Sequence, residues 1–178
     1  MPVHNVHERL LTATPEQVGA LIDSLATGPA DRLWPHRTWT PMAFDGPVVH
    51  GASGGHGPVR YTVAAHVPGT WVRFAFTAPR GFHGFHEYAA LPVDAEHTVL
   101  RHTLSMRITG LARLSWPLGY RWMHDALLED SLDLAERACH GRLPHPARWS
   151  AYVRLLYRLF PEEGTTPDPE PAQAPASR

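Results

Sequence analysis

The order of the segments between Gly54 and Cys139 constrains the fold most strongly. Several consecutive segments alternate apolar and polar residues as strands do, and one long uninterrupted helical segment follows them. His124 lies in the middle of the apolar side of that helix. This order is typical of a curved antiparallel sheet that grips a helix around a cavity, and it directs the search for function to the inside of the domain.

The long helical segment has an apolar side and an acidic side when its residues are placed about 100° apart. We expect the acidic side to face water and His124 to face inward. Gly110 and the pair Trp116-Pro117 mark its start, and Gly141 marks its end. The apolar side contains Tyr120, Met123, His124, Leu127, Leu128, Ser131, Leu134, Ala135 and Ala138. The acidic side contains Asp125, Glu129, Asp133 and Glu136.

Alternation within the strand-like segments separates an inner face from an outer face. Glu87 is poorly tolerated inside, so we expect it on the outer face, paired across a hairpin with Arg101. His86 and His102 then point inward. The predicted strands are Val3–Leu11, Val59–Val67, Trp71–Thr77, Phe82–Leu91 and His97–Thr109. Their inner residues are predicted to be Val59, Tyr61, Val63, Val67, Val72, Phe74, Phe76, Gly84, His86, Tyr88, Ala90, Leu100, His102, Leu104, Met106 and Ile108.

Two features precede these strands. Thr14-Pro15-Glu16-Gln17 can form a capping box and predicts a short helix that ends at Leu25. The Trp-, Pro- and Gly-rich connection from Gly28 to Gly57 is predicted to be irregular around a short helix and a short strand, and to form the mouth of the cavity. Trp34, Trp39 and Trp116 are interpreted as packing residues.

Composition limits the class of protein. The chain has 178 residues, 43% of them hydrophobic, and a formal net charge of −1, which predicts one domain with a sizeable core and no nucleic-acid partner. The single cysteine, Cys139, excludes an internal disulfide and fits a reducing compartment. The N-terminus resembles no secretory signal, and no segment approaches the ~18 apolar residues of a membrane span. We therefore expect a cytoplasmic protein.

The chain resembles a known family in several short motifs. They are Gly54-Gly55-His56-Gly57-Pro58-Val59-Arg60-Tyr61, Pro68-Gly69, His83-Gly84-Phe85-His86, Arg101-His102-Thr103 and His124-Asp125-Ala126-Leu127-Leu128-Glu129-Asp130. Over roughly residues 3 to 140 the chain resembles the START-like superfamily, also called SRPBCC or polyketide cyclase-like, and most of all a bacterial branch without an assigned activity. The resemblance implies an α+β helix-grip fold that binds or transforms lipids, isoprenoids, plant hormones or aromatic polyketides. The superfamily has no universal catalytic motif.

The inner polar residues are the candidate site. His86, His102 and His124 project from apolar faces toward one volume and are the candidate catalytic residues. A buried imidazole needs a hydrogen-bond partner, and a ligand can supply partners for all three at once. The candidate ligand-binding residues are Tyr61, Phe74, Tyr88, Leu104, Tyr120, Leu127, Leu128 and Ser131.

Three interpretations compete for the three histidines. As acids and bases they serve aldol cyclisation and dehydration of a ketone. As a recognition set they orient a hydroxyl or keto group of an apolar ligand that does not react. As zinc ligands they leave one coordination position open, but they come from separate elements without a compact spacing signature. We predict no metal and no cofactor. Ser–His–Asp catalysis is not supported, because His124 and Asp125 point to different helix faces.

Arg60 and His56 belong to the strongest motif and are interpreted as residues of a structural turn, where Gly55 and Gly57 supply backbone freedom. The segment Ala147–Phe160 is predicted to be an amphipathic helix whose apolar face needs a partner. We expect it to dock on its own domain, with a homodimer or a weak membrane-surface contact as alternatives. The tail Pro161–Arg178 is predicted to be disordered. The predicted divisions are therefore residues 1–143, 144–160 and 161–178.

The sequence thus predicts a helix-grip domain that encloses an apolar small molecule. Acid–base cyclisation or dehydration of a polyketide-like ketone, without a cofactor, is the favoured function. Non-catalytic binding or transport of a lipid, isoprenoid or aromatic metabolite is the alternative, and the sequence leaves open whether the protein is an enzyme.

Overall fold

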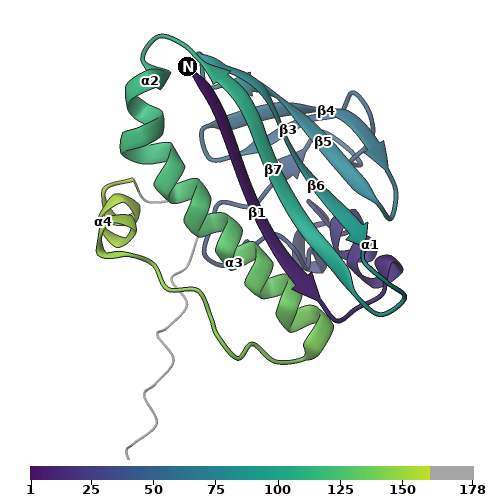
Figure 1. Ribbon diagram of the computed structural model, residues 1–178. Helices are drawn as coiled ribbons and strands as arrows, with labels where there is room; N and C mark the ends of the chain where they lie inside the picture. Colours follow the sequence, from purple (N-terminus) through teal and green to yellow (C-terminus); the bar gives the residue numbers. More distant parts are fainter. Residues whose placement is uncertain (161–178) are drawn as a thin grey trace, which may run out of the picture.

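A computed structural model describes residues 1–160. One antiparallel sheet of seven strands, in the order β1-β7-β6-β5-β4-β3-β2, curves beneath the long helix α3 (Figure 1). The strands are β1 (Pro2–Leu11), β2 (Ala43–Phe44), β3 (Ser53–His56), β4 (Val59–Val67), β5 (Trp71–Ala78), β6 (Phe82–Pro92) and β7 (Thr98–Ile108). The helical segments are α1 (Pro15–Asp23), η1 (Gly28–Ala30), α2 (Ala112–Ser115), η2 (Trp116–Tyr120), α3 (Arg121–His140) and α4 (Ala151–Leu159).

The inner face of the sheet follows from alternation, as predicted. Tyr88 pairs with His102, and His86 pairs with Leu104, so successive inward residues of β6 and β7 lie side by side. These four residues are buried. One predicted inner residue, Val67, is 45% exposed instead. A register shift between Val63 and Ala65 turns the end of β4 over, and alternation alone does not reveal such a bulge.

The predicted capping box opens α1. The Thr14 side chain accepts from the Gln17 backbone N–H, and the Gln17 side chain accepts from the Thr14 N–H. The helix ends at Asp23, two residues before the predicted end at Leu25, because Ser24 caps it.

The sequence predicts an uninterrupted C-terminal helix, but the structure interrupts it. A π-helical turn, η2, separates α2 from α3 at Pro117, which has no N–H to donate to the helical hydrogen-bond series. The predicted end is correct: Gly141 closes α3 in the left-handed conformation with φ 68°.

The acidic side of α3 does not face water, which corrects the sequence prediction. It faces β1, where Arg9 donates to Glu129 at 3.3 Å, to Asp133 at 3.2 Å and to Glu136. Asp133 is only 7% exposed. The helical periodicity was interpreted correctly, but it does not show which element lies opposite each face. Here an edge strand with inward polar residues covers the acidic face.

The predicted pair between Glu87 and Arg101 is also wrong. Arg73 of β5 stands opposite Glu87 and donates to it at 2.7 Å, while Arg101 donates to Glu8 of β1 at 2.8 Å. In the β6–β7 register, Glu87 instead faces Thr103. Glu87 does lie on the outer face, so the alternation was right and the strand register decided the partner.

Helix α4 packs on its own chain. Ser150 caps it, so it begins at Ala151 and is shorter than the predicted range Ala147–Phe160. Val153 and Leu156 are buried against the domain. The Trp149 and Trp39 indole N–H groups both donate to one oxygen of Asp130, at 3.0 and 2.8 Å. The predicted tail, residues 161–178, lies outside the described residues. Among the described helices, none has the length and apolar character needed to cross a membrane.

We predict that Arg9→Gln will destabilise the protein strongly. The change leaves several half-buried carboxylates near β1 without their shared cation, so the free energy of unfolding should fall by about 2 kcal/mol or more. Arg101→Gln is the matched control, because its ion pair with Glu8 is largely exposed and should contribute about 0–1 kcal/mol. Chemical denaturation measures both, and equal effects would contradict the importance of the β1–α3 contact.

We also predict a pH-dependent effect of Asp130→Asn. Burial raises the pKa of Asp130 from 3.8 to about 6, although Trp39 and Trp149 partly offset it. A raised carboxyl pKa stabilises the fold below the unfolded pKa, and this contribution is lost as the pH rises through about 6. The variant should therefore gain stability relative to wild type between about pH 4 and 6 and show no further gain above. A stability difference that is constant with pH would contradict the burial of this carboxylate.

Candidate functional site

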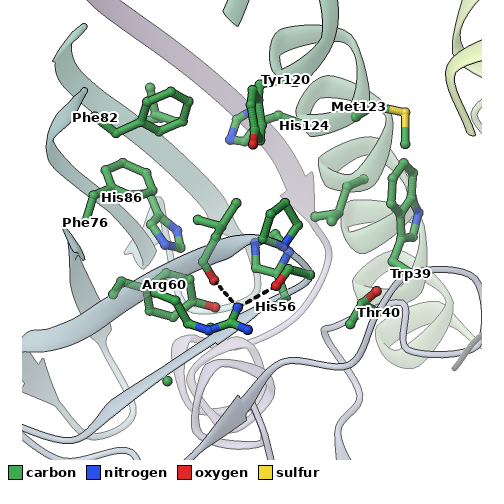
Figure 2. Close-up of a pocket in the computed structure, with 18 of the residues that line it drawn as sticks. Trp39, Thr40, His56, Arg60, Phe76, Phe82, His86, Tyr120, Met123 and His124 are labelled. Atoms are coloured by element: carbon green, nitrogen blue, oxygen red, sulfur yellow. Dashed lines mark hydrogen bonds between the residues drawn. The ribbon is translucent and has the colours of Figure 1, made fainter. Parts of the chain in front are cut away.

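A cavity of about 1320 Å³ lies between the inner face of the sheet and α3, with walls from β3 to β7, η2 and the connection after α1 (Figure 2). Small-molecule pockets usually measure ~300–1,000 Å³, so this one can hold a polycyclic or chain-like ligand. Leu118 of η2, Phe160, and Pro41 and Asp45 of the connection after α1 line it and are also exposed, which places the mouth between η2, the end of α4 and that connection. Most of the lining is apolar or aromatic.

The three predicted histidines meet in this cavity wall. His86 comes from β6, His102 from β7 and His124 from α3, and all three line the cavity. His86 Nδ1 and His102 Nε2 are 3.2 Å apart and share a hydrogen bond. The rings of His102 and His124 are 5.3 Å apart between centroids. Strand alternation and helical periodicity therefore brought all three to one place.

The histidines lie in aromatic surroundings. The His86 ring stacks on Phe76 at 5.1 Å, lies 5.0 Å from Phe74, and meets Tyr61 edge-on at 4.8 Å. Burial lowers the pKa of His86 and of His102 well below the usual value, and it lowers the pKa of His124 as well. Burial also raises the pKa of the Tyr61 phenol well above its ordinary value. At neutral pH the site therefore holds neutral imidazoles and a protonated phenol.

Four buried polar atoms of this wall lack a hydrogen-bond partner among the described residues: Tyr61 Oη, His86 Nε2, His102 Nδ1 and His124 Nε2. Buried polar groups in folded proteins are almost always paired, because an unpaired one costs ~1–3 kcal/mol. All four belong to residues that line the cavity, but the atoms themselves are covered by neighbouring side chains, so a ligand or a water molecule would reach them only after a side-chain movement. They are the principal chemical feature of the site.

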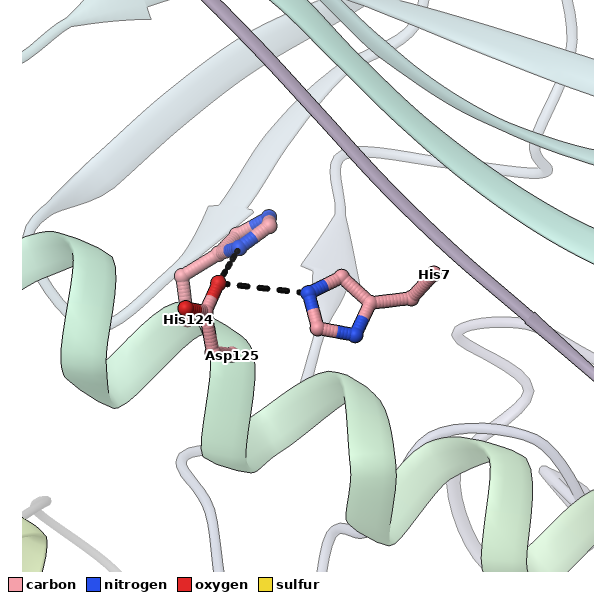
Figure 3. A group of neighbouring side chains, drawn as sticks. All are labelled: His7, His124 and Asp125. Carbon is pink, nitrogen blue, oxygen red and sulfur yellow. Dashed lines mark hydrogen bonds and ion pairs between the residues drawn. The ribbon is translucent and has the colours of Figure 1, made fainter.

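A polar connection links this wall to the surface. His124 Nδ1 lies 3.5 Å from Asp125 Oδ1, which in turn lies 3.2 Å from Nε2 of His7 on β1 (Figure 3). His7 Nδ1 contacts Glu129 at 2.8 Å. Burial alone lowers the pKa of His7, but the hydrogen bonds that its ring donates to Asp125 and Glu129 outweigh burial and raise the pKa to about 9. His124 thus joins the cavity to the acidic side of α3.

The sequence analysis did not identify His7, and it placed Asp125 away from the site. Asp125 does project from another face of α3 than the cavity-facing residues, but adjacent residues on a helix remain close enough for their tips to meet. A signal for His7 was present: Asn5, His7 and Arg9 occupy the alternate positions of β1 that turn inward. Only the pairing of β1 with β7 shows that these positions face α3.

The predicted ligand-binding residues divide into two groups. Tyr61, Leu104, Tyr120, Leu127 and Leu128 line the cavity. Phe74, Tyr88 and Ser131 do not; they are buried in the solid part of the core. The Ser131 hydroxyl donates to the Leu33 carbonyl at 2.8 Å, and the Tyr88 hydroxyl bonds to Ser131 at 2.9 Å. Side chains from α1 and Leu33 belong to the same core cluster and fill that end of the domain.

Residues interpreted as turn or packing residues also line the cavity. The His56 ring packs against Trp34 at a tilt of 54°, with 4.6 Å between the ring centroids, and burial lowers the pKa of His56 to about 3. Trp39 and Trp116 line the cavity while being almost wholly buried. Arg60 holds the β3–β4 turn by donating to the carbonyls of Gly57 and Val59, as Figure 2 shows. The turn interpretation of Arg60 therefore agrees with the structure, and the motif also builds the cavity wall.

Neither a protein-family model nor a curated protein matches this sequence. Solved structures match the fold. Truncated norcoclaurine synthase from Thalictrum flavum gives a TM-score of 0.60 at 11% identity, over 80% of this chain and 96% of that chain. A solution structure from Thermobifida fusca gives 0.57 at 17% identity, over 83% and 99% of the two chains. The di-domain ARO/CYC StfQ from the steffimycin biosynthetic pathway gives 0.59 at 13% identity, over 80% of this chain and 52% of StfQ.

These likenesses concern the architecture. The chain has a helix-grip fold like that of these structures, so the predicted fold class is confirmed. The class of protein is therefore defined by a curved sheet, a gripped helix and an apolar cavity between them. At identities of 11 to 17% the comparisons show the fold alone. The reaction and the ligand are therefore inferred from the geometry of the site.

We predict that Leu127→Trp will fill the cavity at little cost in stability. Leu127 lines the cavity, so the larger ring can occupy existing space and should weaken binding of an apolar fluorescent dye. Leu132→Trp is the matched control, because Leu132 is buried on the same helix away from the cavity, where overpacking costs ~1–3 kcal/mol. Dye titration and denaturation measure both. Equal destabilisation by the two changes, with dye binding intact, would indicate a solid core.

Proposed function

We propose that the protein binds an apolar, polyketide-like ketone in this cavity and catalyses its cyclisation or dehydration by acid–base chemistry. One observation carries the proposal: four unpartnered polar atoms lie in the wall of one large apolar cavity. An apolar ligand with several oxygen atoms can satisfy these groups while its carbon skeleton occupies the aromatic space. Such a ligand matches both the apolar and the polar parts of the site.

The proposal assigns His86 as the base. When His86 carries its proton on Nδ1, it donates to His102 Nε2, and its own Nε2 keeps a free lone pair. Asp125 accepts from His124 Nδ1 and so selects the tautomer of that ring. His102 and His124 are positioning residues in this scheme. The weakly basic His86 can remove a proton only from an acidified carbon, such as the one between two carbonyl groups of a polyketide chain.

The reaction needs no electron acceptor or donor. His86 Nε2 takes the α-proton, the C–H electron pair forms an enolate, and the Tyr61 hydroxyl donates a hydrogen bond to the enolate oxygen. The enolate carbon attacks a second carbonyl group of the same chain and forms a C–C bond. The proton held by His86 then passes to the new alkoxide. In dehydration, a further α-proton and the hydroxyl group leave together as water and a C=C bond forms.

The comparisons support this proposal at the level of the fold. Norcoclaurine synthase and StfQ, described as an ARO/CYC, have a similar architecture. Non-catalytic binding of a lipid, isoprenoid or aromatic metabolite is the second candidate. It is favoured by the strongly lowered pKa of His86 between two phenylalanine rings, because a weak base is better suited to hydrogen bonding than to proton transfer.

We predict that His86→Gln will lower turnover of a poly-β-ketone substrate by ~10²–10⁴-fold while substrate affinity stays broadly unchanged. His83→Gln is the matched control, because His83 lies on the same strand but is exposed outside the cavity. Product formation by liquid chromatography and binding by calorimetry measure the two effects. Full activity of the His86 variant would remove this residue from the mechanism.

Native mass spectrometry of freshly purified protein separates the two candidates. A ligand that is retained unchanged, together with no turnover of any ketone by the wild-type protein, would favour non-catalytic binding. In that case Tyr61→Phe and His86→Gln should both weaken retention of the ligand, because each removes a polar group from the cavity wall.

A further inference from the structure

The contact between β1 and α3 contains a second group of side chains, of which only His124 also lines the cavity. His7, His124 and Asp125 each direct one ligand-type atom to a common point, and these atoms lie within 4.8 Å of one another (Figure 3). We propose that these three residues form a binding site for a divalent transition metal, with Zn²⁺ favoured by the donor set of two imidazole nitrogens and one carboxylate oxygen.

The distances suit zinc. Zn²⁺ binds nitrogen and oxygen at about 2.0–2.2 Å, so neighbouring ligands of a tetrahedral site are roughly 3.3–3.5 Å apart. His7 Nε2 lies 3.2 Å from Asp125 Oδ1, and His124 Nδ1 lies 3.5 Å from the same oxygen. Small side-chain adjustments would therefore complete a site with three protein ligands. The fourth position would remain open to water.

The surroundings of His7 support the assignment. Glu129 Oε1 contacts His7 Nδ1 at 2.8 Å, so this carboxylate holds the ring with Nε2 directed at Asp125 and His124. A histidine that binds zinc commonly donates its other ring N–H to a carboxylate in this way. Glu129 is thus an outer-shell residue that is already in place.

A neighbouring amide offers a further oxygen atom. Asn5 stands two residues before His7 on the same face of β1 and donates from Nδ2 to Asp125 Oδ1 at 3.0 Å. Its buried Oδ1 has no hydrogen-bond partner among residues 1–160. Reversal of this amide would direct the oxygen toward a cation near Asp125, as a further ligand or through a metal-bound water.

The local charge also favours a cation. The acidic side of α3 contributes Asp125, Glu129, Asp133 and Glu136. Arg9 pairs with three of them, and Arg121 lies 3.7 Å from Asp125. Two arginines for four carboxylates leave negative charge that either a proton on His7 or a bound metal ion can neutralise. The metal and the proton therefore compete for the same nitrogen.

This site differs from the zinc site weighed in the sequence analysis. His86 and His102 bond to each other, and of the three inner histidines only His124 joins the new group. His124 also lines the cavity, so a metal here would hold its ring in the cavity wall. Zinc would replace the proton on His124 Nδ1 that the proposed function directs to Asp125. The inference does not rest on that function, because a ligand can occupy the cavity whether or not the metal binds.

The test is zinc titration of chelator-treated protein without an affinity tag, followed by calorimetry and by the visible spectrum with Co²⁺. Wild type should bind one equivalent and give the intense visible bands of low-coordinate Co²⁺. His7→Gln should weaken zinc binding by at least about 100-fold and abolish these bands, and Glu129→Gln should weaken it by ~10–100-fold. The Glu129 variant retains all three ligands, so it still tests the site if the His7 variant folds poorly.

The matched control is His4→Gln, because His4 lies on the same strand and is exposed. With thirteen histidines in the chain, weak binding elsewhere would persist in every variant, and only the difference between His7 and His4 variants identifies the site. Equal zinc affinity in wild type, His7→Gln and Glu129→Gln would overturn the proposal. Absence of zinc binding by the wild type would also overturn it and would leave a proton on His7 as the neutralising charge.

Discussion

The contact between β1 and α3 determines how the helix lies over the sheet. Arg9 and His7 project from an edge strand toward four carboxylates on one side of the helix. Most of these groups are half-buried, and their contacts favour one rotation of α3 about its axis. That rotation turns His124 and Leu127 toward the sheet, where they form one wall of the cavity. A polar contact on the outside of the helix thus positions the functional residues on its inside.

The two ends of the space under α3 are filled differently. At one end α1 and Leu33 pack against Tyr88 and Ser131, and the core is solid. At the other end the aromatic residues of η2, β4 and the connection after α1 line the cavity. Phe44 contacts Tyr61, and Phe82 contacts Trp116 and Tyr120 edge-on, so rigid aromatic side chains line this end of the space.

The cavity combines apolar walls with polar atoms that have no protein partner. Burial keeps the histidines neutral, which gives them lone pairs and N–H groups without the cost of a buried charge. The only connection from these groups to charged residues runs through His124 to Asp125 and His7, among the residues that the structure describes. His124 therefore belongs to two environments, the cavity wall and the contact between β1 and α3.

The sequence by itself determined the directions in which most residues point. Strand alternation placed His86 and His102 inside, helical periodicity placed His124 with them, and the capping box located the start of α1. These results follow from local backbone geometry, which repeats along the chain. Only the tertiary structure decided which residues meet: Arg73 with Glu87, Arg9 with the acidic side of α3, and His7 with Asp125. It also decided which inward residues line the cavity. Trp34 and His56 do, whereas Phe74 and Tyr88 are covered by neighbouring side chains. Partners and voids depend on how distant segments fill one volume, and no local period contains that information.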